Sequence, residues 1–371
     1  MLNLSKVFAS TLSKSENETE FYTSDGSGNL PPEDERGRVR SGNFSMSFLS
    51  WGTAFEPLTS EVDSSLSFNY LKNDARKIIS NRLANEYYNN TGVFLSDSAG
   101  YYEGYGPTSQ EVLIPAFLAA YGYQSADKVT LKAFPEKAVQ AVLRVMPNWN
   151  VTYDGLGKIE ALQKYINSIT LNHSYRSTYS VGSFISNPYY VVDESLGVPI
   201  AYDLQGNFMV EQNINTVTIS EQFSPLFNIN MDWKNSLTTR MEVKKSRTVG
   251  LNMSNTQVNE VRSNELVFGA GYRFNSVQLI INNNEISSDL NVRVDFSFRN
   301  NQTVIRKLED ISGSEITAGQ EILSVKATAD YMLSDKFTMR AFYDQRVNRP
   351  YISNSYDNAN YNVGFSLTFT L

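Results

Sequence analysis

The sequence predicts an all-β protein: an antiparallel transmembrane β-barrel segment, part of a very large barrel, with a mostly helical insertion near residues 57–146. Segments that alternate apolar and polar residues recur along most of the chain, and residues 361–371 alternate most regularly. Many of these segments are close to the roughly ten residues that cross a bilayer at a tilt. No run approaches the roughly 18 consecutive apolar residues that a membrane helix requires.

The composition excludes several classes of function. The 371 residues include no cysteine, so disulfides, zinc–thiolate sites and thiol catalysis are excluded. The net charge of −7, without a dominant basic patch, argues against nucleic acid as a partner. The opening "MLNLSKVFAS" lacks the basic and apolar regions of a signal peptide. If the protein is exported, we therefore expect an N-terminal part that precedes this chain.

Residues 1–56 are predicted to form barrel strands and a polar loop. In "NFSMSFLSW", Phe44, Met46 and Phe48 alternate with smaller or polar residues, as in a strand. The preceding "SDGSGNLPPEDERGRVRSG" has the glycines, prolines and mixed charges of a solvated loop.

Residues 57–146 are predicted to form a helical or irregular insertion, a candidate plug or cap. Apolar residues between Leu71 and Leu83 recur at helical spacing. "TSQEVLIPAFLAAYGY" is a second helix candidate, in which Thr108 and Ser109 are possible caps. Pro115 is expected to kink this helix or to end its first turn.

Residues 147–371 are predicted to be antiparallel barrel strands that continue to the C-terminus. "LFNINMDW", "LNVRVDFSF" and "LSVKATADYML" each divide into an apolar and a polar face. The candidates for the lipid-facing side are Phe227, Ile229, Trp233, Val294, Phe296, Phe365 and Phe369. The candidates for the lumen-facing side are Asn228, Asp232, Arg293, Asp295, Lys326, Asp330 and Arg340.

The connections between these strands differ in length. "SDK" and "RNNQT" are predicted to be short turns, whereas "EDISGSEITAG" and "VNRPYISNSYDNAN" are predicted to be long loops. Short turns on one side and long loops on the other are typical of outer-membrane barrels.

Periodicity alone does not separate a membrane barrel from a soluble β-sandwich, because both bury one face of each strand. Strand length, the apolar end of the last strand and the charges of both signs on the polar face favour the barrel. Two alternatives stay open: a small-solute outer-membrane porin or transporter, and a soluble extracellular β-sandwich that acts as an adhesin or binding protein.

No residue pattern predicts an enzyme, a cofactor or a metal site. His173 is the single histidine, and a structural position in a strand is the expectation for it. Gly269 and Gly271 form a GxG pattern, but strand residues continue on both sides, so they are expected to relieve crowding on a barrel's inner face or to permit a bend. Carboxylates such as Asp344 are expected to form cross-strand charge pairs. "GYYEGYGP" is expected to be a mobile surface loop, with an aromatic flap as the alternative.

Several segments, in order, resemble the C-terminal region of the SprA/Sov family. They are "PNWNVTYDGLGKI", "TLNHSYRSTYSVGSF", "ISEQFSPL", "LVFGAGYRF", "SDLNVRVDFSFRNNQTVIRKLE" and "LSDKFTMRAFYDQRVNRPYISNSY". Members of this family are giant single-chain outer-membrane barrels, the translocon of the type IX secretion system of Bacteroidetes. They are several times longer than this chain, so the resemblance implies the last part of such a barrel.

The resemblance implies a function in protein transport across the bacterial cell outer membrane, within the secretion and gliding-motility machinery. It implies a passive pore for secreted cargo proteins, with no covalent chemistry. The implied partners are an outer-membrane partner barrel, a periplasmic plug protein and membrane lipid. An inner-membrane motor would supply the energy, so no nucleotide site is expected in this chain.

Overall fold

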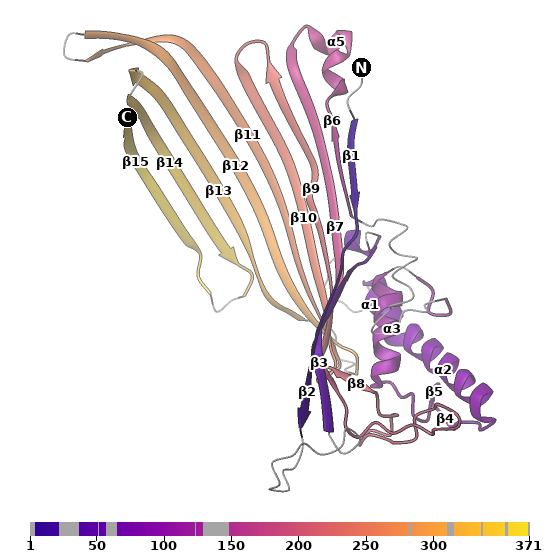
Figure 1. Ribbon diagram of the computed structural model, residues 1–371. Helices are drawn as coiled ribbons and strands as arrows, with labels where there is room; N and C mark the ends of the chain where they lie inside the picture. The colour runs from indigo at the N-terminus through magenta and orange to yellow at the C-terminus, as the bar shows by residue number, and fades with distance from the viewer. Residues whose placement is uncertain are drawn as a thin grey trace, which may run out of the picture.

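The computed structural model describes residues 4–21, 37–50, 52–56, 65–122, 124–128, 148–281, 284–309, 315–334, 337–352 and 355–369. Most of them belong to one antiparallel sheet, which confirms the all-β prediction (Figure 1). Its N-terminal strands are β1 (Leu4–Ala9), β2 (Leu12–Phe21), β3 (Gly37–Ser47), β6 (Asn148–Tyr153), β7 (Ile166–Ser186) and β8 (Gln212–Ile214). Its remaining strands are β9 (Thr216–Trp233), β10 (Leu237–Asn252), β11 (Gln257–Ile281), β12 (Asn284–Lys307), β13 (Glu315–Ser334), β14 (Phe337–Pro350) and β15 (Asn358–Phe369).

The sheet is an up-and-down meander. Its hydrogen-bonded order is β1-β6-β7-β9-β10-β11-β12-β13-β14-β15, so neighbours in space from β9 onward are neighbours in the chain. In the part of the chain that the structure describes, β1 and β2 form one edge, β15 forms the other, and no pairing joins the two edges. The sheet is therefore open, and these residues do not form a closed barrel.

One strand of the meander is built from two distant pieces of chain. β3 pairs with β7 up to Ser47↔Thr178, and β6 continues along the same strand from Trp149↔Tyr175. On the other side, β2 pairs with β3 and β1 pairs with β6. The chain thus leaves the sheet after Ser47, forms the insertion, and returns at Asn148 to complete the strand.

The described part of the insertion contains three main helical segments. They are α1 (Leu66–Tyr70) with a π-helical turn (Leu71–Ala75), α2 (Arg76–Thr91) and α3 (Gln110–Tyr121). The Ser65 side chain caps α1 by accepting a hydrogen bond from the Phe68 backbone N–H. Gly92, with φ +71°, ends α2 in the left-handed conformation that glycine adopts without strain. α3 is buried along its whole length except at its first two residues, which explains why its sequence is apolar on every side.

The insertion is less helical than predicted. Residues 92–109 form an irregular loop with the short strands β4 (Asp97–Ser98) and β5 (Tyr101–Tyr102). The segment 129–147 lies outside the described residues. Ser109 is the N-cap of α3, but its side chain caps nothing; its backbone carbonyl accepts from Val112 and Leu113 instead. Pro115 lies inside α3, and the helix continues to Tyr121.

One predicted turn is wrong. "RNNQT" lies within β12, which runs unbroken from Asn284 to Lys307, because each of these polar residues pairs with β11. This run of polar residues therefore lies inside β12 and does not mark the end of the strand. "SDK" does separate β13 from β14, and both predicted long loops are shorter than expected because the strands extend into them.

The core lies between the helices and one half of one sheet face. α1, the π turn, α2 and α3 pack on β3, β7, β9, β10 and β11 near the lower ends of these strands in Figure 1. Phe68, Leu71, Ile79 and Phe117 on the helices are fully buried. Tyr179, Ile219 and Leu251 are among the residues that meet them from the sheet. We call the helices and the 92–109 loop the helical module.

Candidate functional site

The sheet has two chemically different faces, and the register assigns each residue to one of them. The row Asn228↔Glu242↔Val267↔Ser297↔Ser324 lies on one face, and the adjacent row Phe227↔Val243↔Leu266↔Phe298↔Leu323 lies on the other. The first is the polar face and the second is the apolar face. All seven lumen-facing candidates lie on the polar face: Asn228, Asp232, Arg293, Asp295, Lys326, Asp330 and Arg340. All seven lipid-facing candidates lie on the apolar face: Phe227, Ile229, Trp233, Val294, Phe296, Phe365 and Phe369.

Charges on the polar face are paired with one another. Arg293 Nε donates to Asp295 Oδ2 at 2.7 Å, and Arg340 Nε donates to Asp330 Oδ1 at 2.5 Å. Lys326 Nζ lies 3.5 Å from Asp344 Oδ2 on the neighbouring strand. Each exposed pair contributes little stability, about 0–1 kcal/mol, but together they leave the surface close to electrically neutral.

The polar face is hollowed. A cavity of about 570 Å³ is lined by Arg240, Glu265, Arg293, Lys326 and Asp344, among others. Gly269 and Gly271 line a second hollow of about 340 Å³ on the same face. A Cβ on Gly269 would lie 2.4 Å from Asp295 Oδ1, and one on Gly271 would lie 2.6 Å from Thr238 Oγ1. These glycines therefore make room for polar side chains of adjacent strands, as the sequence predicts.

The apolar face carries a band of exposed hydrophobic side chains on β9–β15. Phe268 is 50% exposed, Val294 42% and Phe365 79%, although all belong to long, regular strands. On β15 the band covers alternate positions from Ala359 to Phe369. At about 3.4 Å per residue and a tilt of about 40°, this length corresponds to a height of about 25 Å, which is the height of the apolar band of outer-membrane barrels.

The band ends abruptly at one register row. The next row on the same face is Phe223↔Lys245↔Asn264↔Asn300↔Glu321↔Arg349, which is polar except for its first member. We call it the boundary row. On the far side of the boundary row, the same face of β7 and β9–β12 is covered by the helical module.

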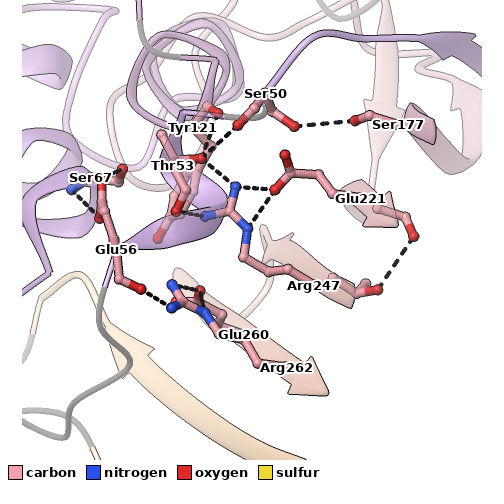
Figure 2. A network of polar contacts seen from close by, with 12 residues as sticks. Ser50, Thr53, Glu56, Ser67, Tyr121, Ser177, Glu221, Arg247, Glu260 and Arg262 are labelled. Atoms are coloured by element: carbon pink, nitrogen blue, oxygen red, sulfur yellow. Dashed lines mark hydrogen bonds and ion pairs between the residues drawn. The ribbon is translucent and has the colours of Figure 1, made fainter. Parts of the chain in front are cut away.

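Charged residues are buried where the helical module meets the sheet. Arg247, Arg262, Arg306, Glu221 and Glu260 are each at most 6% exposed. Arg247 Nε donates to Glu221 Oε2 at 2.7 Å, and Arg306 Nη1 donates to Glu260 Oε2 at 2.6 Å. Arg262 Nε donates to Glu260 Oε1 at 2.7 Å. We call these five residues the charge cluster; Figure 2 shows four of them and the residues that they hold.

The charge cluster holds the segment that links β3 to the helical module. Arg247 Nη1 donates to the Thr53 carbonyl at 2.6 Å, and Arg262 Nη1 donates to the Glu56 carbonyl. The Glu56 carboxylate in turn accepts from Ser67 Oγ at 2.5 Å and from the Ser67 backbone N–H at 3.1 Å at the start of α1 (Figure 2). A buried ion pair contributes little net stability by itself, but removal of one partner leaves an uncompensated charge. The cluster therefore specifies how the module docks.

The two buried carboxyl groups differ in their electrostatic environment. Burial raises the pKa of Glu221, and the Arg247 guanidinium only partly opposes this effect. Burial by itself would raise the pKa of Glu260, but Arg262, Arg247 and Arg306 together outweigh this effect, so the pKa is lowered. Burial and the Glu221 carboxylate raise the pKa of Tyr175 to about 12. Tyr175 donates its hydroxyl to Glu221 Oε1 at 3.1 Å.

His173, the single histidine, occupies a structural position in a strand. His173 Nδ1 lies 2.5 Å from the Leu226 carbonyl oxygen, beside Trp149 and Phe223. The described residues contain no group of three or more His, Asp and Glu side chains that could hold a metal ion. No helix in the described parts of the chain is long and apolar enough to cross a membrane.

The "GYYEGYGP" loop is fixed by specific contacts. Phe208 N donates to the Gly104 carbonyl at 2.8 Å, and Gly106 N donates to Asn207 Oδ1 at 3.0 Å. The Tyr105 ring packs edge-on against Phe208 at 5.2 Å. The expectation of a mobile loop is therefore wrong: the loop packs on residues 203–208 and is part of the helical module.

Sequence reasoning did not identify the charge cluster. The signal was present in β10, where Arg247 has the same strand parity as Val243, Val249 and Leu251. A charge in phase with an apolar series indicates either a functional site or a buried pair. Its partners, however, come from other strands and from the 52–56 segment, and no local pattern identifies them.

No protein-family model matches the sequence, and no curated protein matches it.

Proposed function

We propose that this chain is part of the wall of a large outer-membrane β-barrel whose polar face lines a protein-conducting lumen. The observation that carries the proposal is the apolar band, about 25 Å in height, bounded by a polar row and backed by a hollowed, charge-paired face. A soluble sheet with this much exposed apolar surface would require a second layer over the band. The described residues place no such layer there.

The open sheet is consistent with one part of a barrel wall that further strands complete. Backbone groups at a sheet edge cannot stay unpaired in hydrocarbon, because no water is available to bond them. β1 and β15 each need a neighbouring strand. Further strands of a larger barrel would supply both, in agreement with the resemblance to the SprA/Sov translocons.

The polar face suits passage of protein without adhesion. Several of its cations and carboxylates bond to each other, so a passing polypeptide meets neither a strong single-sign field nor an apolar surface. No residue is assigned a covalent step. Transport through such a wall is passive.

The position of the helical module favours a cap over a plug. The module packs on the same sheet face as the apolar band, beyond the boundary row. If the band faces lipid, the module lies outside the lumen and beyond the membrane. The more extended connections, including residues 187–211, lie at this same end of the strands (Figure 1).

A pair of substitutions on neighbouring residues of β12 tests the assignment of the faces. Phe296→Arg places a charge in the apolar band and is expected to cost about 2–4 kcal/mol and to block membrane assembly. Asp295→Asn, one residue away on the polar face, should assemble normally. Assembly is read from the membrane fraction and from resistance to urea extraction. Equal assembly of both variants would falsify the face assignment, and a protein that stays monodisperse without detergent would favour the soluble β-sandwich.

A further inference from the structure

The boundary row contains a lysine with an unusual setting. Lys245 is half-buried on the apolar face, and its Nζ lies 4.5 Å from the centre of the Phe55 ring. Phe55 is 48% exposed and packs against Phe223 at 5.3 Å between ring centres. Phe223 is the residue directly opposite Lys245 in the register. A cation and an exposed aromatic ring thus lie together at the level where the apolar band ends.

The carboxylates near Lys245 are already engaged. Glu221 bonds to Arg247, and Glu260 bonds to Arg262 and Arg306. Among the residues that the structure describes, no carboxylate forms an ion pair with Lys245. The positive charge of Lys245 is therefore not neutralised by an ion pair within the described residues, and it lies beside the end of the apolar band.

We propose that Lys245 and Phe55 form a binding site for the phosphate of an anionic lipid headgroup. The proposal rests on the proposed function, because the boundary row must lie at the membrane surface. At that level, the acyl chains of the lipid contact the apolar band, on the side of the boundary row that faces away from the helical module. Its phosphate lies within reach of Lys245, whose aliphatic stem extends along apolar surface. The exposed Phe55 ring adds apolar contact surface at the level where the band ends.

The geometry favours a lipid over a free anion. On the side of the apolar band, Lys245 is followed by the register row of Phe227 and Val243, whose side chains offer nothing to a small solvated phosphate. The helical module closes the opposite side. A ligand that fills this position needs both an anionic group and an apolar tail.

Fluorescence quenching of Trp149 by brominated lipids tests the site. The Trp149 ring packs at a tilt against Tyr175, with 4.5 Å between ring centres, and Tyr175 packs on Phe223 at 4.7 Å, so Trp149 reports on the end of the band. Trp51→Phe and Trp233→Phe leave it as the only tryptophan among these 371 residues. The protein is reconstituted in bilayers that contain either brominated phosphatidylglycerol or brominated phosphatidylcholine. Roughly fivefold less phosphatidylglycerol than phosphatidylcholine should be needed for half-quenching.

Two substitutions of Lys245 and one of a lysine on the opposite face separate the effect of Lys245 from a general effect of net charge. Lys245→Met should abolish the preference for phosphatidylglycerol, and Lys245→Arg should keep it. Lys326→Met removes a cation from the polar face and should leave the preference unchanged. A preference that persists in Lys245→Met, or that is absent from the parent protein, would overturn the site.

The remaining outcomes distinguish the sources of failure. Equal quenching by both lipids would overturn the headgroup site and leave the membrane wall intact. No quenching by either lipid would overturn the membrane wall as well. Loss of the preference on addition of inorganic phosphate would show a free-anion site and would also overturn the lipid assignment.

Discussion

The side-chain amide of Asn148 donates a hydrogen bond to Ser47 Oγ at 2.9 Å, although the two residues are 101 positions apart. Ser47 is the last residue of β3 and Asn148 the first of β6, so this bond joins the two pieces of one strand. Asn148 Oδ1 also accepts from the Ser177 backbone N–H at 2.8 Å, which satisfies a donor of β7 at the junction. The helical module is therefore inserted into a strand whose continuity a single side chain restores.

The junction should depend on Asn148. Asn148→Leu removes both bonds and leaves the buried Ser177 N–H without a partner, so we expect the free energy of unfolding to fall by about 1–3 kcal/mol. Urea unfolding of the reconstituted protein measures the change. Asn291→Leu, an exposed polar-face position on β12, is the control and should change stability much less. Equal losses in the two variants would contradict a special role for the junction.

Docking of the helical module should depend on the buried pair between Arg247 and Glu221. Arg247→Met alone leaves the Glu221 carboxylate buried without its guanidinium, and we expect a loss of about 3–5 kcal/mol. The double variant Glu221→Leu/Arg247→Met removes both charges and should recover much of that loss. Limited proteolysis of the 92–109 loop and urea unfolding report the effect. A double variant as unstable as Arg247→Met alone would show that the loss comes from other bonds of Arg247, such as the one to the Thr53 carbonyl, and not from an uncompensated Glu221 charge.

The charge cluster should make the docked state sensitive to acid. The pKa of Glu260 is lower in the folded protein than in the unfolded chain, so the unfolded state binds the proton more readily. The stability from Glu260 is therefore complete above its unfolded pKa of about 4.3 and is lost as the pH falls through its lower folded pKa. Glu221 has the opposite shift and partly offsets this loss.

Stability measured as a function of pH separates the two carboxyl groups. Glu260→Gln should be destabilised at neutral pH and should show a flatter decline in acid than the parent protein. Glu221→Gln should keep the acid decline. If Glu260→Gln declines as steeply as the parent, another carboxyl group is responsible.

The fixed conformation of the "GYYEGYGP" loop should depend on Gly104. A Cβ at this position would lie 2.2 Å from the Phe208 ring, and its φ of +79° is itself unfavourable for other residues. Gly104→Ala should therefore destabilise the helical module by more than the roughly 1 kcal/mol expected of backbone strain alone. Gly206→Ala, at φ +78° with open space around it, isolates the strain. Near-ultraviolet circular dichroism of the tyrosines reports the packing; similar losses in both variants would exclude the ring contact as the cause.

Some of these features could be read directly from residue order. Alternation in "LNVRVDFSF" predicted that Val294 and Phe296 share a face and that Arg293 and Asp295 share the other, and the register agrees. This succeeds because side chains alternate by local backbone geometry, which each strand has regardless of its neighbours. The helical period of the insertion was readable for the same reason. The ends of the strands could not be predicted from the sequence. The polar run in β12 looked like a turn, because only the pairing with β11 shows that the hydrogen bonds of β12 continue through it.

By itself, then, the sequence determined the strand class, the two faces and the existence of helices between strands. Only the tertiary structure decided the level at which the apolar band ends, because that level is a row across strands and depends on register. It also decided that Arg247 meets Thr53, which lies 194 positions away, and that β3 and β6 complete one strand. Such contacts arise when separate elements dock, and the free energy that selects them belongs to the assembled sheet and module and to no single segment of the chain.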